Sequence, residues 1–238
     1  MLFGMTSLLW MTKTEKYSIV EKHLILQQIG IPMAKLHFYY SAMNAGKTTT
    51  LLQSNYNYQE RGMETLLFIP AIDTRHALGM IASRIGLQAE AIPFQNSFNF
   101  FQYIYTHLQK NRLDCVLVDE AQFLTKSQVI DLTRIVDELK IPVLTYGLRS
   151  DFRGETFEGS QYLLAWAEDI SEIKAICHCG RKATMNARIS EDGSIVKTGA
   201  QVEIGGNDRY IALCRQHFMK GETTSLKQPL NKVFKQAS

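Results

Sequence analysis

Short apolar runs alternate with helical patterns through the first two thirds of the chain, and this alternation limits the possible folds more than any other feature. Runs of four or five mainly apolar residues, the length of buried strands, cover residues 36–40, 65–69, 115–118 and 142–146. Helical patterns fill the intervals at residues 48–60, 99–111 and 128–139. We therefore expect an α/β fold with a largely parallel sheet covered by helices on both faces.

The composition is that of an ordinary globular protein of one or two domains, since 45% of the 238 residues are hydrophobic and 21% are charged. The formal net charge of +3 gives no electrostatic reason to expect a surface that wraps nucleic acid. No apolar stretch reaches the roughly 18 residues that a membrane helix requires. We therefore expect a cytoplasmic protein that acts without a nucleic acid or a membrane.

The first 32 residues precede the first strand pattern and are expected to form an N-terminal extension outside the fold. Their apolar segment, residues 2–11, is too short to span a membrane, follows no positive charge and lacks a convincing cleavage site. A secretory signal stays as the alternative. Met33 stands directly before the strand pattern, so it can itself be the start of the protein.

A candidate phosphate-binding loop joins the first expected strand to the first expected helix. The segment Ser41-Ala42-Met43-Asn44-Ala45-Gly46-Lys47-Thr48 resembles a Walker A sequence, which is meaningful only between a strand and a helix. Backbone N–H groups of such a loop face the phosphates of ATP, Lys47 adds a positive charge, and the Thr48 hydroxyl can ligate Mg²⁺. Ser41 stands where the general pattern has glycine, so a chance Gly-Lys-Thr at a helix start is the alternative.

Two carboxylates follow the expected strand at residues 115–118. Open α/β sheets collect their ligands at the carboxyl ends of strands, so Asp119 and Glu120 have the position of a Walker B pair. Asp119 is expected to hold magnesium, and Glu120 can accept a proton from an attacking hydroxyl group. Two solvated acids at a strand end are the alternative. Together with the loop at residues 41–48, the pair predicts a P-loop sheet of the RecA-like type.

The sequence Asp119-Glu120-Ala121-Gln122 also resembles the acidic box of a helicase or another ATPase, in which the glutamate activates water. A single phosphate-loop core, with no second core of this type and no strongly basic face, is poorly suited to translocation along a strand. A P-loop ATPase is therefore kept only as an alternative.

Three of the four cysteines lie in the C-terminal quarter with a histidine nearby. Cys177 and Cys179, followed after 34 intervening residues by Cys214 and His217, form a Cys₃His set for tetrahedral Zn²⁺. Four protein ligands fill the coordination sphere, so the metal is expected to be structural. His178 is left out because adjacent residues rarely reach one metal. Free thiols with an incidental histidine, and a zinc ribbon that binds nucleic acid, are the alternatives.

Four longer segments resemble the thymidine kinases of the type shared by bacteria, poxviruses and the animal cytosol, and the bacterial branch most closely. They are YSAMNAGKT at 40–48, SNYNYQERG at 54–62, VDEAQF at 118–123 and YGLRSDFRG at 146–154. The resemblance extends from about Met33 to Met219. It implies an ATP-dependent deoxynucleoside kinase that transfers the γ-phosphate of ATP to the 5′-hydroxyl of thymidine, with deoxyuridine as a further candidate acceptor.

The resemblance also implies roles for single residues. Glu120 is implied as the general base that takes the proton of the thymidine 5′-hydroxyl. Asp73 and Arg75 resemble the family's Asp-x-Arg loop, in which the acid helps to hold magnesium and the arginine meets the transferred phosphate. The expected magnesium ligands are Thr48, Asp73 and Asp119, and the expected ATP site adds Asp119 and Gln122 to residues 41–48.

The thymine pocket implied by the family is made by a long loop that closes over the base, here residues 190–206. Tyr210 resembles the residue that contacts the nucleoside, and apolar side chains are expected to line the ring face. The expected nucleoside-binding residues are Met43, Leu148, Phe152, Gly205 and Tyr210. For Met43 and Leu148, ordinary core packing is the alternative.

The expected organisation is a P-loop core at residues 33–170, a small ribbon-like zinc lobe with the substrate-covering loop at residues 171–220, and a C-terminal tail at residues 221–238. Through the resemblance, the expected partners are ATP, thymidine and the feedback inhibitor dTTP. The resemblance further implies a homotetramer that serves nucleotide salvage for DNA synthesis.

Overall fold

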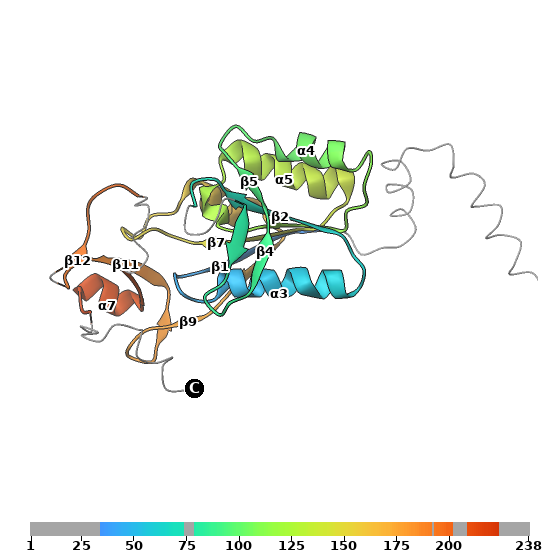
Figure 1. Ribbon diagram of the computed structural model, residues 1–238. Helices are drawn as coiled ribbons and strands as arrows, with labels where there is room; N and C mark the ends of the chain where they lie inside the picture. Colours follow the sequence, from blue (N-terminus) through green and yellow to red (C-terminus); the bar gives the residue numbers. More distant parts are fainter. Residues whose placement is uncertain (1–33, 74–78, 192, 202–208, 224–238) are drawn as a thin grey trace, which may run out of the picture.

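The computed structural model describes residues 34–73, 79–191, 193–201 and 209–223. A six-stranded sheet forms its centre (Figure 1), and all neighbouring strands in it are parallel. From one edge to the other, the strands are β5 (Ile92–Phe94), β2 (Thr65–Pro70), β6 (Cys115–Val118), β7 (Val143–Leu148), β1 (Leu36–Ser41) and β8 (Asp169–Glu172). The predicted parallel sheet is confirmed, with strands at all four predicted positions.

Helices cover both faces of this sheet, as the alternating pattern predicts. α3 (Lys47–Glu60) lies on one face, and α4 (Phe100–His107) and α5 (Lys126–Leu139) lie on the other (Figure 1). α6 (Glu158–Trp166) packs beside α5. Each face has its own buried apolar cluster, so the core consists of two layers separated by the sheet.

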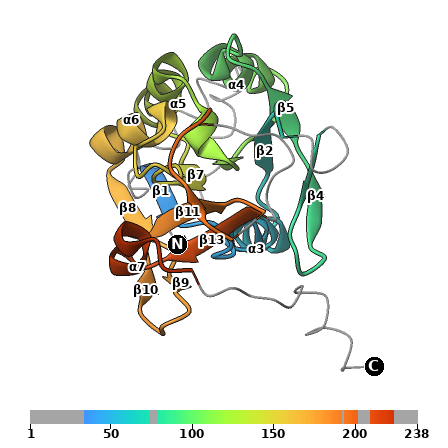
Figure 2. The same ribbon diagram turned by 90° about the vertical axis from the view of Figure 1, so that its left-hand side faces the viewer.

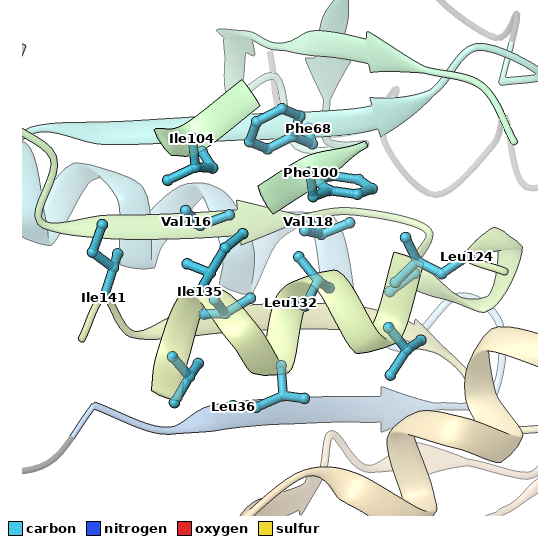
Figure 3. Packing of buried hydrophobic residues seen from close by; sticks show 14 of the residues in the cluster. Leu36, Phe68, Phe100, Ile104, Val116, Val118, Leu124, Leu132, Ile135 and Ile141 are labelled. Carbon is cyan, nitrogen blue, oxygen red and sulfur yellow. The ribbon is translucent and has the colours of Figure 1, made fainter. Parts of the chain in front are cut away.

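The central strand β6 shows why the sheet needs both layers. All four of its residues are fully buried, and they alternate between the two apolar clusters. Val116 and Val118 belong to the cluster that contains Leu132 and Ile135 of α5 (Figure 3). The other two residues of β6 belong to the cluster beneath α3. A strand that is apolar at every position is stable only between two apolar layers.

α5 begins two residues before its predicted start, because side chains cap its first turn. Thr125 Oγ1 accepts a hydrogen bond from the backbone N–H of Gln128, and Gln128 Oε1 accepts one from the backbone N–H of Thr125. This reciprocal pair satisfies N–H groups that have no partner within the helix. The helical pattern alone marks where apolar residues recur, so it misses a polar first turn.

Several elements were not predicted. The segment after β2 forms a hairpin of β3 (Met80–Ala82) and β4 (Gln88–Glu90) before β5. α6 was not predicted because it begins inside residues 151–159, a polar stretch that contains glycine. β8 pairs with β1, so the sheet ends at Glu172, two residues beyond the expected limit of the core. The expected N-terminal extension lies outside the described residues, as does the tail from residue 224.

The chain after β8 forms a small lobe of antiparallel strands (Figure 2). Its strands are β9 (Ala175–Ile176), β10 (Lys182–Ala183), β11 (Met185–Ile189), β12 (Ile195–Val196) and β13 (Tyr210–Leu213), followed by α7 (Arg215–Lys220). β11 lies between β12 and β13 in a three-stranded sheet. The predicted ribbon-like lobe is confirmed. Within the described ranges, no helix combines the length and the apolar character needed to cross a bilayer.

Candidate active site and metal centre

The phosphate loop, residues 41–48, leaves the carboxyl end of β1 and enters α3. Asn44 and Gly46 have positive φ angles of 63° and 86°, so the loop turns sharply before the helix. The side chain of Lys47 is only 7% exposed, and its Nζ donates a hydrogen bond of 3.2 Å to Ser41 Oγ. No side chain caps α3, which leaves its first N–H groups for an anion.

The acidic pair meets the phosphate loop directly. Asp119 follows β6, is 1% exposed, and accepts a hydrogen bond of 3.0 Å from Thr48 Oγ1. Only β7 separates β6 from β1, so these parallel strands end at the same edge of the sheet. Burial, together with the neighbouring charge of Glu120, raises the pKa of Asp119 to about 7. A divalent cation bound here would stabilise the charged carboxylate.

The side chain of Gln122 holds Glu120 in position. Glu120 has a left-handed φ of 48° and turns the chain from β6 into the short 3₁₀ helix η2 (Ala121–Phe123). Gln122 Nε2 donates a hydrogen bond of 2.5 Å to Glu120 Oε2, and Gln122 Oε1 accepts one of 3.0 Å from the backbone N–H of Leu148. The Glu120 carboxylate is therefore fixed relative to the end of β7.

Two glycines permit the close packing around Gln122. A Cβ atom on Gly147 would lie 3.0 Å from Gln122 Oε1. A Cβ atom on Gly159 of α6 would lie 2.5 Å from the Ala121 carbonyl oxygen and 2.8 Å from that of Leu124. α6 therefore approaches the backbone of η2 at a distance that only glycine allows. A glycine inside a helix is a known signal of such packing, but the sequence analysis missed it because it did not predict α6.

Two of the residues expected to line the nucleoside pocket, Leu148 and Phe152, lie at and just beyond the carboxyl end of β7. Leu148 is 9% exposed and Phe152 is 1% exposed. The guanidinium of Arg188, on β11, lies 3.9 Å from the centroid of the Phe152 ring, and Tyr210 pairs with Arg188 across β11 and β13. Arg188 Nη2 also donates a hydrogen bond of 3.0 Å to the Thr198 carbonyl. One side chain thus connects Phe152 to the loop expected to cover the base.

Asp151 holds the far part of the same loop. Its side chain is buried, and its Oδ1 accepts hydrogen bonds from the backbone N–H groups of Arg153 and Glu155 at 2.8 and 3.0 Å. Its Oδ2 accepts from Gln201 Nε2 at 3.1 Å and from Arg153 Nε at 2.9 Å. A buried carboxylate is stable only with such partners. The sequence analysis gave no role to Asp151, because a loop acid is usually solvated.

Asn186 of β11, like Arg188 and Asp151, is a buried polar residue that was not predicted from the sequence. Its Oδ1 accepts a hydrogen bond of 2.7 Å from the backbone N–H of Met43, and its Nδ2 donates one of 2.7 Å to the Ser150 carbonyl. Polar residues at alternate positions of a strand usually face solvent. Here the phosphate loop and the end of β7 cover that face, so the side chain is 2% exposed.

The remaining predicted residues are placed as follows. Asp73 follows β2, whose register puts Phe68 opposite Val118 of β6, so Asp73 lies beyond the same edge of the sheet as Asp119. Arg75 and Gly205 lie outside the described residues. Their assigned roles therefore stay predictions.

Cys177, Cys179, Cys214 and His217 lie together, as predicted, in a candidate metal-binding group with all possible ligand atoms within 4.8 Å of one another. The sulfurs of Cys179 and Cys214 are 3.9 Å apart, and Cys177 Sγ is 3.4 Å from His217 Nδ1. Tetrahedral zinc, with Zn–S of about 2.3 Å and Zn–N of about 2.0 Å, separates two sulfurs by about 3.8 Å and sulfur from nitrogen by about 3.5 Å. The group therefore fits a zinc ion. His178, left out of the set, stacks on His217 with ring centroids 4.4 Å apart.

The comparison with known proteins identifies the family to which this site belongs. The family model for thymidine kinase matches residues 34–218, which contain the sheet, the acidic pair and the metal-binding group. The chain belongs to the thymidine kinase family.

Several proteins named thymidine kinase are similar to this chain over nearly their whole length. That of Legionella pneumophila (strain Lens) is 60% identical over 205 residues, which are 85% of this chain and 97% of the relative. That of Coxiella burnetii is 60% identical over 196 residues, 82% of this chain and 100% of the relative. That of Haemophilus influenzae (strain ATCC 51907 / DSM 11121 / KW20 / Rd) is 58% identical over 186 residues, 78% and 96% respectively.

Membership of the thymidine kinase family makes the chain a kinase. It favours this class over the two alternatives kept from the sequence, a P-loop ATPase and a zinc ribbon that binds nucleic acid. The thymidine kinase match covers both the P-loop sheet and the metal-binding lobe, so both parts belong to the family's common structure.

Proposed function

We propose that this protein transfers the γ-phosphate of ATP to the 5′-hydroxyl of thymidine and so produces dTMP. The observation that carries the proposal is the 3.0 Å hydrogen bond between Thr48 of the phosphate loop and Asp119 of the acidic pair. It joins the expected phosphate-binding and magnesium-binding groups directly beside Glu120. The similarity to proteins named thymidine kinase supports thymidine as the acceptor.

In this proposal, residues 41–48 bind ATP together with Asp119 and Gln122. The magnesium ligands are Thr48, Asp73 and Asp119, and the ion would neutralise charge on the phosphates. The Lys47 ammonium is already buried within the loop, so little reorganisation is needed when the phosphates arrive. The raised pKa of Asp119 supports a cation site, because a cation stabilises the charged form of the carboxylate.

Glu120 is the proposed general base. Its carboxylate accepts the proton of the 5′-hydroxyl while that oxygen attacks the γ-phosphorus and ADP leaves. The hydrogen bond from Gln122 gives the carboxylate a fixed direction, which a proton acceptor in a positioned reaction requires. Arg75 would meet the phosphate in transfer. Placement of the two substrates and charge neutralisation supply most of the rate.

The nucleoside is proposed to lie between Phe152 and the loop before Tyr210, with Met43, Leu148 and Gly205 completing the pocket. Arg188 supports this placement, because its guanidinium contacts both the Phe152 ring and the loop carbonyl of Thr198. The loop extends from a lobe whose two ends are joined by the metal-binding group. Zinc is therefore proposed to be structural, holding the base of the loop.

Other features are proposed on the family resemblance alone. They are cytoplasmic nucleotide salvage for DNA synthesis, inhibition by dTTP, and a homotetrameric assembly. We also propose that the P-loop core begins at residue 33 and includes β8 up to residue 172, that the zinc lobe follows it to residue 220, and that residues 1–32 and 221–238 lie outside both.

Phosphoryl transfer from ATP to a panel of nucleosides tests the proposal. The purified chain is supplied with ATP, Mg²⁺ and one nucleoside at a time, and the monophosphates are quantified. We expect dTMP to form, and the rate with deoxyuridine shows how much the 5-methyl group contributes. Stimulation of ATP hydrolysis by DNA, without any transfer to thymidine, would contradict the proposal.

A further inference from the structure

The buried side chain of Asn186 connects the part of the proposed site that binds ATP with the part that binds the nucleoside. It lies on β11 of the metal-binding lobe and is 2% exposed. It binds the Met43 N–H of the phosphate loop and the Ser150 carbonyl, each at 2.7 Å. Ser150 lies between Leu148 and Phe152, the residues proposed to contact the nucleoside.

The chemistry of the two partners requires an amide. The Met43 N–H can only donate and the Ser150 carbonyl can only accept, so the bridging side chain must offer an acceptor and a donor together. Asparagine does so at this length. An ionised aspartate offers acceptors but no donor, and a threonine can donate and accept only through one oxygen atom, whereas the amide has a separate atom for each partner. The bond to Ser150 is buried and the bond from Met43 is partly buried, so losing either leaves a backbone group without its partner.

The surroundings of Asn186 hold this bridge in place. β11 is the central strand of the three-stranded sheet in the lobe, and Asn186 lies opposite Ala212 of β13. Close by, Arg149 Nη2 donates a hydrogen bond of 3.2 Å to the Thr184 carbonyl, which is a second connection between core and lobe. Asn186 is therefore held by a central β-strand, so it can transmit a displacement of the Ser150 carbonyl to the Met43 N–H.

We propose that Asn186 is a positioning residue that couples nucleoside binding to ATP binding. The inference rests on the proposed function and names the residue that connects its two substrates. A nucleoside that orders residues 148–152 fixes the Ser150 carbonyl. Asn186 then fixes the Met43 N–H, and with it the phosphate loop. Coupling between two binding sites is reciprocal, so each substrate favours the other.

The test measures the affinity of the full chain for a non-hydrolysable ATP analogue with Mg²⁺, by calorimetry, with and without saturating thymidine. In the wild type, thymidine is expected to tighten this binding by at least about fivefold, the lower end of usual coupling. In Asn186→Ala, the factor is expected to fall below about twofold, while each ligand alone still binds. An unchanged factor in a folded Asn186→Ala protein would overturn the proposal.

Thr145→Val is the matched control. The side chain of Thr145 is buried in the sheet, and its Oγ1 donates a hydrogen bond of 2.7 Å to the His37 carbonyl between β7 and β1. Its loss is expected to lower Tm and to leave the coupling factor unchanged. If Asn186→Ala is too unstable to purify, Asn186→Leu replaces it, because a leucine of similar size offers neither an acceptor to the Met43 N–H nor a donor to the Ser150 carbonyl, and the factor should again fall.

The outcomes separate this inference from the proposed function. A wild type that transfers phosphate to thymidine but shows no coupling contradicts only the role of Asn186. A wild type that couples the two ligands but transfers no phosphate contradicts the kinase proposal and leaves the bridge standing. In steady state, the KM values for both substrates should rise in the Asn186 variants and stay constant in Thr145→Val.

Discussion

Glu120 combines an unfavourable backbone conformation with a fixed side chain. Its left-handed φ of 48° is uncommon for a residue with a Cβ atom, and the Gln122 amide holds its carboxylate. Such strain persists only where the surrounding structure imposes it, and it gathers at functional sites. In the proposed mechanism this turn has a role, because it places Glu120 directly after Asp119, which is hydrogen-bonded to Thr48 of the phosphate loop.

Glu120→Gln tests the general base. The amide keeps the size of the side chain but cannot accept the proton, so we expect ATP binding to persist and kcat to fall by roughly two orders of magnitude or more. The transfer assay and calorimetry with an ATP analogue give the two readouts. Glu138→Gln, which changes an exposed glutamate of α5, serves as the control. Near-normal turnover in Glu120→Gln would refute the assignment.

Asp119 is predicted to destabilise the free protein at neutral pH. Its pKa rises from the usual 3.8 to about 7 on folding. Between these values the folded state binds more protons than the unfolded state, so the free energy of unfolding falls as the pH rises. Without nucleotide and Mg²⁺, we expect Asp119→Asn to have a higher Tm than the wild type at pH 8, by at least about 2 °C.

The size of this effect on Tm must change with pH. Below pH 3.8 the carboxyl is protonated in both states, so the difference in Tm between wild type and Asp119→Asn should shrink toward that pH. Thermal unfolding at several pH values measures it. A variant that is less stable than the wild type at pH 8 would show that the buried charge is already compensated in the free protein.

At the scale of secondary-structure elements, the contact between α6 and η2 sets the position of Glu120, the residue directly before η2. Gly159 brings the helix against the carbonyl groups of the η2 turn. Exchange of glycine for alanine inside a helix normally stabilises it by about 1 kcal/mol. At this position the new Cβ would lie 2.5 Å from a carbonyl oxygen, so the steric effect opposes the helix propensity.

We expect the steric effect to win, with Gly159→Ala destabilising the protein by about 1–3 kcal/mol. The displaced turn should also lower kcat, because Glu120 and Gln122 move with it. Denaturant unfolding and the transfer assay measure the two effects. Gln161→Ala, at an exposed position of the same helix, should change neither. A more stable Gly159→Ala protein would show that α6 can shift without harm.

For the whole molecule, the metal-binding group connects stability to substrate binding. Cys177 and Cys179 precede β10 and β11, and Cys214 follows β13, so a zinc ion would join both ends of the lobe. The lobe in turn supplies Asn186 and Arg188 to the site. Loss of the metal should therefore affect folding and nucleoside binding together.

Cys214→Ser is expected to reduce zinc content, to lower Tm and to raise the KM for thymidine. Cys115→Ser is the matched control, because Cys115 is a buried thiol of β6 outside the metal-binding group. The control should lose stability but keep both its zinc and its KM. Metal analysis, thermal unfolding and steady-state kinetics give the three readouts. An unchanged KM in a zinc-free protein would contradict a role of the metal in nucleoside binding.

The sequence by itself determined the parallel sheet, the positions of the expected phosphate loop and the acidic pair, and the four residues of the candidate metal-binding group. These features depend on residues that are close together in the sequence. A strand buried on two faces must be apolar throughout, as β6 is, and a loop or a metal knuckle needs its residues at short fixed spacings. The capped start of α5 and the polar start of α6 were missed, because neither shows apolar periodicity.

Only the tertiary structure decided how these centres are connected. Asn186 is hydrogen-bonded to Met43, which lies 143 residues earlier in the chain, and Gly159 packs against the η2 turn that follows β6. Asp151 and Arg188 are buried because the loop at residues 198–201 covers them. Whether a polar side chain is solvated or bonded depends on segments brought together by folding, and that information is absent from the residues next to it in the chain.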